Sequence, residues 1–244
     1  MPIDLADYEN KARRAIRLFW GDQSKAGGGL AAVGSERGDS GNRRSMQGFV
    51  DLIAELVRVN GLAGAEIFGK RSQTVLPGYF RATKSWDVLV MHHGVLIAAI
   101  ELKSQIRPAY NNNFNLRAEE AVGSAADFWT AFREHMFGNQ PRPFLGLLLL
   151  VEDMPGSRAT VDHVANHFEI QPAFRGASHL ERYDVLCQRL IREQLYASAA
   201  LIVSSRQGGA GGEYEELSPI TGLRAFVSAL AGHVAAEACR LGAA

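Results

Sequence analysis

The sequence predicts an α/β domain with a central mixed β-sheet flanked by helices. Segments with apolar residues at helical spacing alternate with apolar runs of strand length, an order that favours this class. Residues 86–104 read WDVLVMHHGVLIAAIELKS, and two apolar runs that meet at His92-His93-Gly94 predict an antiparallel hairpin. The uninterrupted run LGLLLLV at 145–151 is typical of a strand buried on both faces. A hairpin combined with such a strand indicates a mixed sheet.

The remaining segments supply the helices. Apolar residues recur at helical spacing in residues 4–20 and 45–60, and at a 4-3-4-3-4 spacing from Ala118 to Met136, which predicts three amphipathic helices. The C-terminal part then predicts a helix near 179–197, the strand AALIVS, a Gly-rich turn at 208–212, and a helix from Pro219 with Ser218 as its N-cap. No repeat or sharp boundary divides the chain, so residues 1–244 are interpreted as one domain.

One long segment does not fit a packed element. Residues 21–48 contain eight glycines together with Arg37, Arg43 and Arg44. Because this composition is too polar and too permissive to pack, we expect a long loop or a partly mobile arm. A loop of this length inside a compact domain is usually functional or disordered.

Composition excludes several classes of protein. The chain holds 26 Lys and Arg against 26 Asp and Glu, which argues against a protein that coats DNA through its overall charge. Its two cysteines exclude a disulfide framework or a cysteine zinc site and suit a reducing compartment. The longest apolar run is too short to cross a bilayer, and the N-terminus lacks an uninterrupted apolar core. We therefore expect a cytoplasmic protein with no membrane partner, and any nucleic-acid site must be a local patch.

The predicted hairpin carries three ionisable side chains whose placement depends on its turn. Successive side chains of a strand alternate between faces, so Glu101 and Lys103 share one face. A three-residue loop at 92–94 pairs Asp87 with Ala99 and sets Asp87 on the face of Glu101. A two-residue turn would instead pair Asp87 with residue 100 and move it to the other face.

Two carboxylates that converge on a sheet face repel each other unless a proton or a cation lies between them. Mg²⁺ resolves this repulsion, because it favours one or two carboxylates with water and phosphate oxygens as its other ligands. An adjacent lysine orients or deprotonates the attacking water and offsets charge that develops on phosphorus. Asp87, Glu101 and Lys103 are therefore a minimal set for phosphodiester hydrolysis, and the structural alternative is three solvated residues at the rim of a sheet.

The sequence also resembles a known family. The arrangement of Asp87 with Glu101-Leu102-Lys103 resembles the PD-(D/E)xK nuclease superfamily, and longer stretches between about residues 45 and 155 resemble the XhoI family of type II restriction endonucleases. These stretches are LPGYFRATKSWDVLV, AAIELKSQ, NNNFNLRAEEAVGSAADFWTAFRE and PRPFLGLLLLVED. Trp86 stands where the superfamily name has proline, a position that tolerates variation.

The resemblance implies a restriction-endonuclease-like core and a DNA-cutting site. Asp87 and Glu101 would be metal ligands, and Lys103 would be the catalytic lysine. Glu55, on the polar side of the helix at 45–60, matches the first-helix glutamate that some superfamily members use for a metal, with Glu66 as its competitor. The implied enzyme is a Mg²⁺-dependent homodimer that cuts both strands of a palindromic duplex, typically CTCGAG, and is paired with a DNA methyltransferase.

Candidates for contacts with double-stranded DNA follow the hairpin. Asn side chains make paired hydrogen bonds to adenine, Arg to guanine, and short amides to phosphate. The candidates are Lys84, Arg107, Asn111, Asn112, Asn113, Asn115 and Arg117. The structural alternative is a polar loop in which Asn115 caps the helix that follows.

Two other functions stay open at this level. A structure-specific nuclease that acts on junctions or in repair would use the same three residues. A DNA-binding module with an inactive nuclease face belongs to a different class, since it would bind DNA and not cut it.

Overall fold

The computed structural model describes residues 3–25, 46–106, 110–162 and 164–242. Its main feature is a five-stranded sheet in the order β1-β4-β5-β6-β7. The strands are β1 (Glu66–Phe68), β4 (Val88–His92), β5 (Val95–Gln105), β6 (Phe144–Glu152) and β7 (Ser198–Ser204). Strand β4 is antiparallel to both of its neighbours, β1 and β5, whereas β5, β6 and β7 are parallel to one another. The predicted mixed sheet is thus confirmed.

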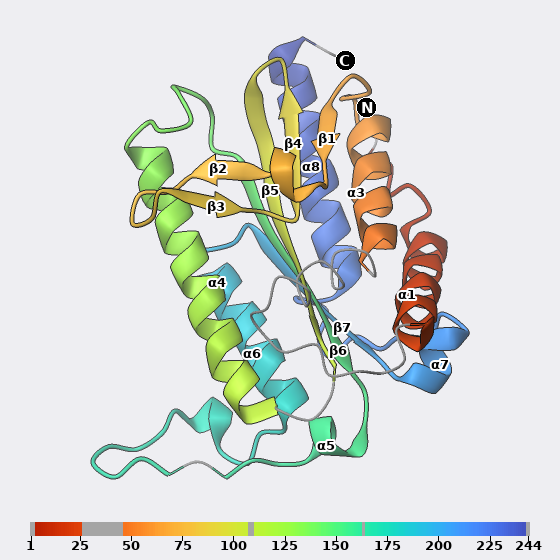
Figure 1. The fold of residues 1–244 in the computed structure, drawn as a ribbon, viewed down its shortest axis with the longest axis vertical. Helices are drawn as coiled ribbons and strands as arrows, with labels where there is room; N and C mark the ends of the chain where they lie inside the picture. Colours follow the sequence, from red (N-terminus) through yellow and green to blue (C-terminus); the bar gives the residue numbers. More distant parts are fainter. Residues whose placement is uncertain (1–2, 26–45, 107–109, 163, 243–244) are drawn as a thin grey trace.

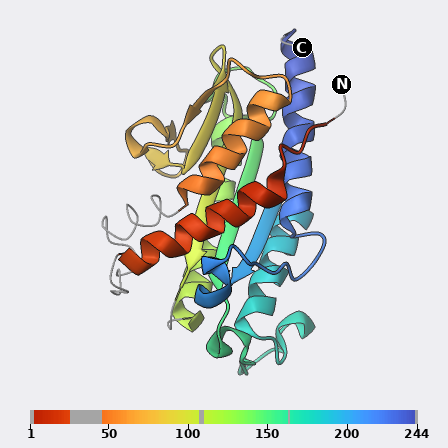
Figure 2. The same cartoon turned by 90° about the vertical axis from the view of Figure 1, so that its right-hand side faces the viewer.

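Helices cover both faces of this sheet (Figure 1). On one face lie α1 (Tyr8–Lys25), α3 (Gln47–Val59) and α8 (Leu223–Leu241), which Figure 2 shows in front of the strands. On the other face lie α4 (Tyr110–Arg133) and α6 (His179–Arg192). Two short helices, α5 (Pro155–Arg158) and α7 (Arg206–Ala210), follow β6 and β7. The α/β fold predicted from the sequence is confirmed.

The alternation of side chains along β5 divides the core into two layers. Ile100 and Leu102 pack with α3 and α8, whereas Ala99 packs with α4 and α6. Every residue of β6 is buried, because helices cover both of its faces, as its uninterrupted apolar run predicted. Glu101 and Lys103 alternate with Leu102, so they project toward the layer of α4 and α6.

A small second sheet stands beside the main one. It consists of β2 (Val75–Pro77) and β3 (Thr83–Ser85), an antiparallel pair preceded by the 3₁₀ turn Arg71–Gln73. Figure 1 shows this pair extending from the region of β4 and β5 toward α4. Strands of three residues leave almost no periodic pattern, which is why the sequence predicted only a basic run here.

The turn between β4 and β5 differs from the prediction. His92 pairs with Val95, so the turn has two residues, and His93 and Gly94 both have positive φ angles of 49° and 78°. This combination is a type I′ turn, whose twist matches that of the flanking strands. The predicted three-residue loop is wrong.

A β-bulge reverses the consequence of that shorter turn. The register shifts between Val90 and Met91, so that Met91 pairs with Leu96 but Val90 pairs with Ala98. Ile97 is the extra residue, and both it and Ala98 lie in the layer of α3 and α8. Val88 therefore pairs with Ile100, and continuing this register by one residue places Asp87 across from Glu101.

Several predicted boundaries are also wrong. Helix α1 continues to Lys25, and α3 begins at Gln47, so both ends of the predicted 21–48 arm are helical, while residues 26–45 lie outside the described ranges. Helix α4 begins at Tyr110 and not near Ala118, because its first turns are polar and carry no apolar stripe. The predicted polar loop, with Asn115 as a helix cap, is therefore part of a helix.

The C-terminal boundaries shift for reasons of hydrogen bonding. Helix α8 begins at Leu223 after Gly222, and the hydroxyl of Ser218 donates to Asp184 on α6 and does not cap α8. Most of the predicted Gly-rich turn forms α7, capped by Ser205, whose hydroxyl accepts from the N–H of Gly208. Within the described parts of the chain, no helix combines the length and apolarity that a membrane span requires.

Candidate active site

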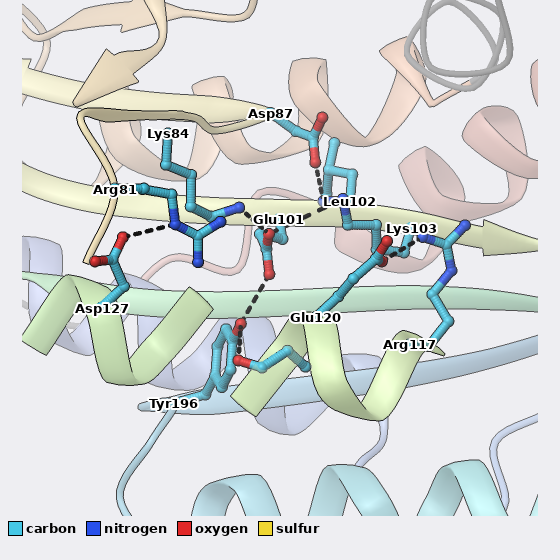
Figure 3. A network of polar contacts seen from close by, with 11 residues as sticks. Arg81, Lys84, Asp87, Glu101, Leu102, Lys103, Arg117, Glu120, Asp127 and Tyr196 are labelled. Carbon is cyan, nitrogen blue, oxygen red and sulfur yellow. Dashed lines mark hydrogen bonds and ion pairs between the residues drawn. The ribbon is translucent and has the colours of Figure 1, made fainter. Parts of the chain in front are cut away.

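Glu101 is the centre of a buried polar network on β5. Its side chain is 2% exposed, and both carboxylate oxygens accept strong hydrogen bonds. Lys84 on β3 donates to Oε1 at 2.7 Å, and the hydroxyl of Tyr196, which precedes β7, donates to Oε2 at 2.7 Å. The Lys103 Nζ lies 3.9 Å from Oε1. Figure 3 shows these groups gathered between β5 and α4.

Asp87 is fixed against the same strand just before β4 begins. Its backbone N–H donates to the carbonyl of Ile100 at 3.2 Å, and its Oδ2 accepts from the N–H of Leu102 at 2.9 Å. The Asp87 carboxylate thus accepts a hydrogen bond from β5 at a point beyond Ile100, whose pairing with Val88 is the last between β4 and β5. Asp87 is 7% exposed, and its alternation with Val88 places it on the face of Glu101 and Lys103.

Charge governs the protonation of this cluster. Burial would raise the pKa of Glu101, but the charges of Lys103 and Lys84 and the hydrogen bonds from Lys84 and Tyr196 outweigh it and hold that pKa below its ordinary value of 4.5. Burial would lower the pKa of Lys103, but the carboxylates of Glu101 and Asp87 keep it above its ordinary value. Glu101 is therefore an anion and Lys103 a cation at neutral pH.

This depressed pKa predicts a pH dependence of stability. A carboxyl group whose pKa is lower in the folded state stabilises that state above its unfolded pKa, and this contribution is lost as the pH falls through the folded pKa. We expect the wild-type protein to be more stable than Glu101→Gln at neutral pH, with a difference that shrinks below pH 4.5, the ordinary pKa. Urea unfolding of both proteins from about pH 7 to about pH 3 measures it. A difference that is constant with pH would contradict the proposed protonation state.

Lys84 connects the small sheet to this cluster. Its ammonium lies over the ring of Trp86 at 4.6 Å, and that ring is buried edge-on against Phe128 of α4. Its side chain is only 13% exposed, and it contacts Glu101. The sequence predicted Lys84 as a DNA contact, and in this structure its charge is directed to the carboxylate.

The glutamates proposed as further metal ligands lie apart from this network. Glu55 on α3 forms an ion pair with Lys11 of α1 at 2.9 Å and is 45% exposed. Glu66 is exposed on the edge strand β1, opposite Met91. Across the residues that the structure describes, no group of three or more His, Cys, Asp and Glu side chains converges closely enough to hold a metal ion. The structure thus brings Asp87, Glu101 and Lys103 together without Glu55 or Glu66.

Comparison with known proteins identifies the family. The sequence model of the family "Restriction endonuclease XhoI" matches residues 23–216, which is most of the chain. The chain belongs to the XhoI family. Its members are restriction endonucleases, so this protein is a type II restriction enzyme, a site-specific deoxyribonuclease.

Three curated relatives support this placement in the XhoI family. The type II restriction enzyme XhoI of Xanthomonas vasicola is 47% identical over 194 residues, which cover 78% of each chain. AbrI of Azospirillum brasilense is 47% identical over 180 residues, covering 72% of this chain and 80% of that relative. BstVI of Geobacillus stearothermophilus is 42% identical over 211 residues, covering 82% and 94%. No solved structure matches the chain.

Five of the seven DNA-contact candidates of this XhoI-family chain lie at the start of α4. Asn111, Asn112 and Asn113 occupy its first turn, and Asn115 is exposed. Arg117 is partly buried and donates to Glu120 at 2.6 Å, one turn along the helix. Lys103 interacts electrostatically with both Arg117 and Glu120, so this part of α4 lies beside the face that carries Glu101 and Lys103. Arg107 lies outside the described residues.

Sequence reasoning missed Tyr196 as a member of the site. Its ring is 1% exposed, and its hydroxyl contacts Glu101 and the carbonyl of Ala121. Burial raises the pKa of the Tyr196 hydroxyl, and contact with the Glu101 carboxylate raises that pKa further. The hydroxyl therefore stays a proton donor at neutral pH. Because 95 residues separate the two side chains along the chain, no local pattern connects them.

Proposed function

We propose that this restriction enzyme hydrolyses DNA with Mg²⁺ held by Asp87 and Glu101, with Lys103 as the catalytic lysine. The observation that carries the proposal is the gathering of these three side chains on one face of β4 and β5. There a bulge and a type I′ turn together bring Asp87 across from Glu101. A set of solvated rim residues does not account for Glu101, which is 2% exposed.

The donor set fits magnesium. Asp87 and Glu101 supply carboxylate oxygens, and Mg²⁺ takes one or two carboxylates with water and phosphate oxygens as further ligands. The Lys84 ammonium at 2.7 Å is already a cation in contact with Oε1 of Glu101. When bound, the ion supplies a Lewis acid that polarises the scissile phosphate. Glu55 stays a candidate for a further ligand.

The chain's own residues hold the reacting groups and compensate charge. Tyr196 fixes one oxygen of Glu101, so the other oxygen keeps a defined direction toward Lys84 and Lys103. Lys103 orients the attacking water and donates a hydrogen bond to the phosphoryl oxygens, where negative charge develops. In the proposal Lys84 neutralises Glu101 in the free protein, and it would be available for a DNA phosphate if the carboxylate held a metal ion instead.

We further propose that the enzyme is a homodimer that recognises CTCGAG. The support is 47% identity, over 78% of each chain, to a relative named XhoI, since the resemblance to the XhoI family implies CTCGAG as the site. A two-fold dimer presents identical contacts to the two halves of a palindrome, and each subunit cuts one strand. Asn111, Asn112, Asn113, Asn115, Arg107 and Arg117 are the candidates for base and phosphate contacts, and a DNA methyltransferase would protect the host genome.

Digestion of DNA of known sequence tests this function. With Mg²⁺ we expect discrete fragments whose mapped ends lie at CTCGAG, and no cleavage when the metal is chelated. The matched controls are the same DNA with every CTCGAG altered by one base pair, and the same DNA methylated at that site. Fragments that depend on branched substrates would favour the structure-specific nuclease, and binding without cleavage would favour an inactive DNA-binding module.

A further inference from the structure

The tip of the β2–β3 hairpin presents two aromatic rings to solvent. Phe80 is 72% exposed and Tyr79 is 50% exposed, and the two rings pack edge to face with centroids 5.0 Å apart. Large aromatic side chains are usually buried, so an adjacent exposed pair is an uncommon surface feature. Neither residue belongs to the catalytic network described above.

A buried carboxylate holds this tip in one conformation. Asp127 of α4 is 2% exposed, and its Oδ1 accepts from the backbone N–H groups of Tyr79 and Phe80 at 2.9 and 2.7 Å. Its Oδ2 pairs with Arg81 Nε at 3.0 Å. A side chain on Gly78 would stand 2.6 Å from the Arg81 carbonyl, so the turn has no room for one. The tip is therefore rigid, and its exposed rings lose little conformational entropy on binding a partner.

The same hairpin reaches the catalytic site. Lys84, four residues after Phe80, contacts Glu101 at 2.7 Å. Four residues span at most about 14 Å, which is comparable with the ~12 Å width of the DNA major groove. A duplex whose scissile phosphate lies at Asp87 and Glu101 therefore passes within reach of the tip. Figure 3 shows the Arg81–Asp127 contact and the Lys84–Glu101 contact side by side.

Charge favours DNA over a second protein as the partner. Residues 69–84 contain Lys70, Arg71, Arg81 and Lys84 and no acidic residue, and two of these four cations, Arg81 and Lys84, are paired with Asp127 and Glu101 in the free protein. Exposed aromatic rings beside cations suit a DNA duplex, because base edges in the groove offer apolar contacts such as the thymine methyl and phosphates attract the charges.

We propose that Tyr79 and Phe80 form a DNA contact that packs into the groove of the duplex beside the scissile phosphate. The proposal rests on the proposed function and extends it to a second part of the DNA interface. Asp127 is then a positioning residue for the tip, and Arg81 adds charge at its edge. The β2–β3 hairpin would thus contact the DNA groove through Tyr79 and Phe80 at its tip, while Lys84 at its base contacts Glu101.

Phe80→Ala and Tyr79→Ala test the contact. We expect each variant to bind a CTCGAG duplex about 5-fold more weakly or worse, as expected for the loss of an apolar contact with base edges in the groove, and Phe80→Glu to bind more weakly still. Fluorescence anisotropy in EDTA measures binding without cleavage. Because both rings are exposed, unfolding is not expected, and thermal melting of each variant verifies this. Unchanged affinity in the Phe80 variants would overturn the proposal.

The control variant is Phe168→Ala. Phe168 is 85% exposed and lies in the loop between α5 and α6, so its removal deletes an equally exposed ring elsewhere. Equal loss of affinity in this control would overturn the assignment to the hairpin. So would a shift from dimer to monomer in Phe80→Ala without DNA, because the rings would then contact a second copy. Wild-type protein that neither binds nor cuts DNA would refute the proposed function itself, whereas wild-type cleavage with unaffected Phe80 variants refutes only this contact.

Discussion

Replacement of Lys103 by alanine is expected to slow DNA cleavage by about 10²–10⁴-fold, the usual contribution of a positioned proton-transfer or charge-stabilising group. Lys103 projects from β5 beside Glu101, and no other lysine follows Asp87 along the hairpin. Single-turnover cleavage of a CTCGAG duplex gives the rate, and anisotropy in EDTA gives the affinity. Because Lys103 is one of several cations near the site, affinity should fall far less than the rate.

Lys103→Arg is the matched variant, because it keeps the charge and changes the shape of the donor. We expect its rate to lie between those of the wild type and Lys103→Ala. Cleavage by Lys103→Ala at the wild-type rate would show that the lysine has no role in the reaction. Wild-type protein that binds without cutting, together with unchanged binding by Lys103→Ala, would instead indicate an inactive DNA-binding module.

Glu101→Ala is expected to destabilise the fold as well as abolish cleavage. The change leaves Lys84, Lys103 and the Tyr196 hydroxyl without their shared acceptor, and removing one partner of a buried ion pair typically costs 3–5 kcal/mol. Since the two lysines are 13% and 22% exposed, they can partly turn to water, and we expect about 3 kcal/mol. Urea unfolding measures this loss.

Glu101→Gln separates stability from catalysis. Its amide oxygen can still accept from Tyr196, so we expect it to lose less stability than Glu101→Ala, while cleavage is lost in both. Tyr196→Phe makes the complementary change, since it leaves an oxygen of Glu101 without its donor at a cost of about 1–3 kcal/mol. If Glu101→Ala were as stable as the wild type, the network around Glu101 would contribute nothing to the fold.

The sequence was sufficient to predict the layers and to single out Asp87, Glu101 and Lys103 as candidate site residues, for a physical reason. Strands β5 and β6 are long apolar runs, and the charged residues within or beside such runs are conspicuous. Asp87, Glu101 and Lys103 were therefore identifiable, because side chains two apart on a strand share a face. Short elements were not: β1, β2 and β3 have three residues each, too few for a periodic pattern.

Contacts between distant parts of the chain lay beyond sequence reasoning. Tyr196 reaches Glu101 from the far side of β6, and Asp127 reaches the hairpin tip from α4. The start of α4 was misplaced because its polar first turns carry no apolar stripe. Lys84 was predicted for DNA because a basic run was visible, while its acidic partner 17 residues away became apparent only in three dimensions.

The bulge at Ile97 constrains how this hairpin can change its length during evolution. Thirteen residues separate Asp87 from Glu101, and two in the turn plus one in the bulge leave ten that form five cross-strand pairs. Insertion or deletion of a single residue would move one carboxylate to the opposite face of the sheet. Net changes of length should therefore survive only in steps of two residues, and a residue gained in the turn should survive only with the loss of the extra residue in the bulge.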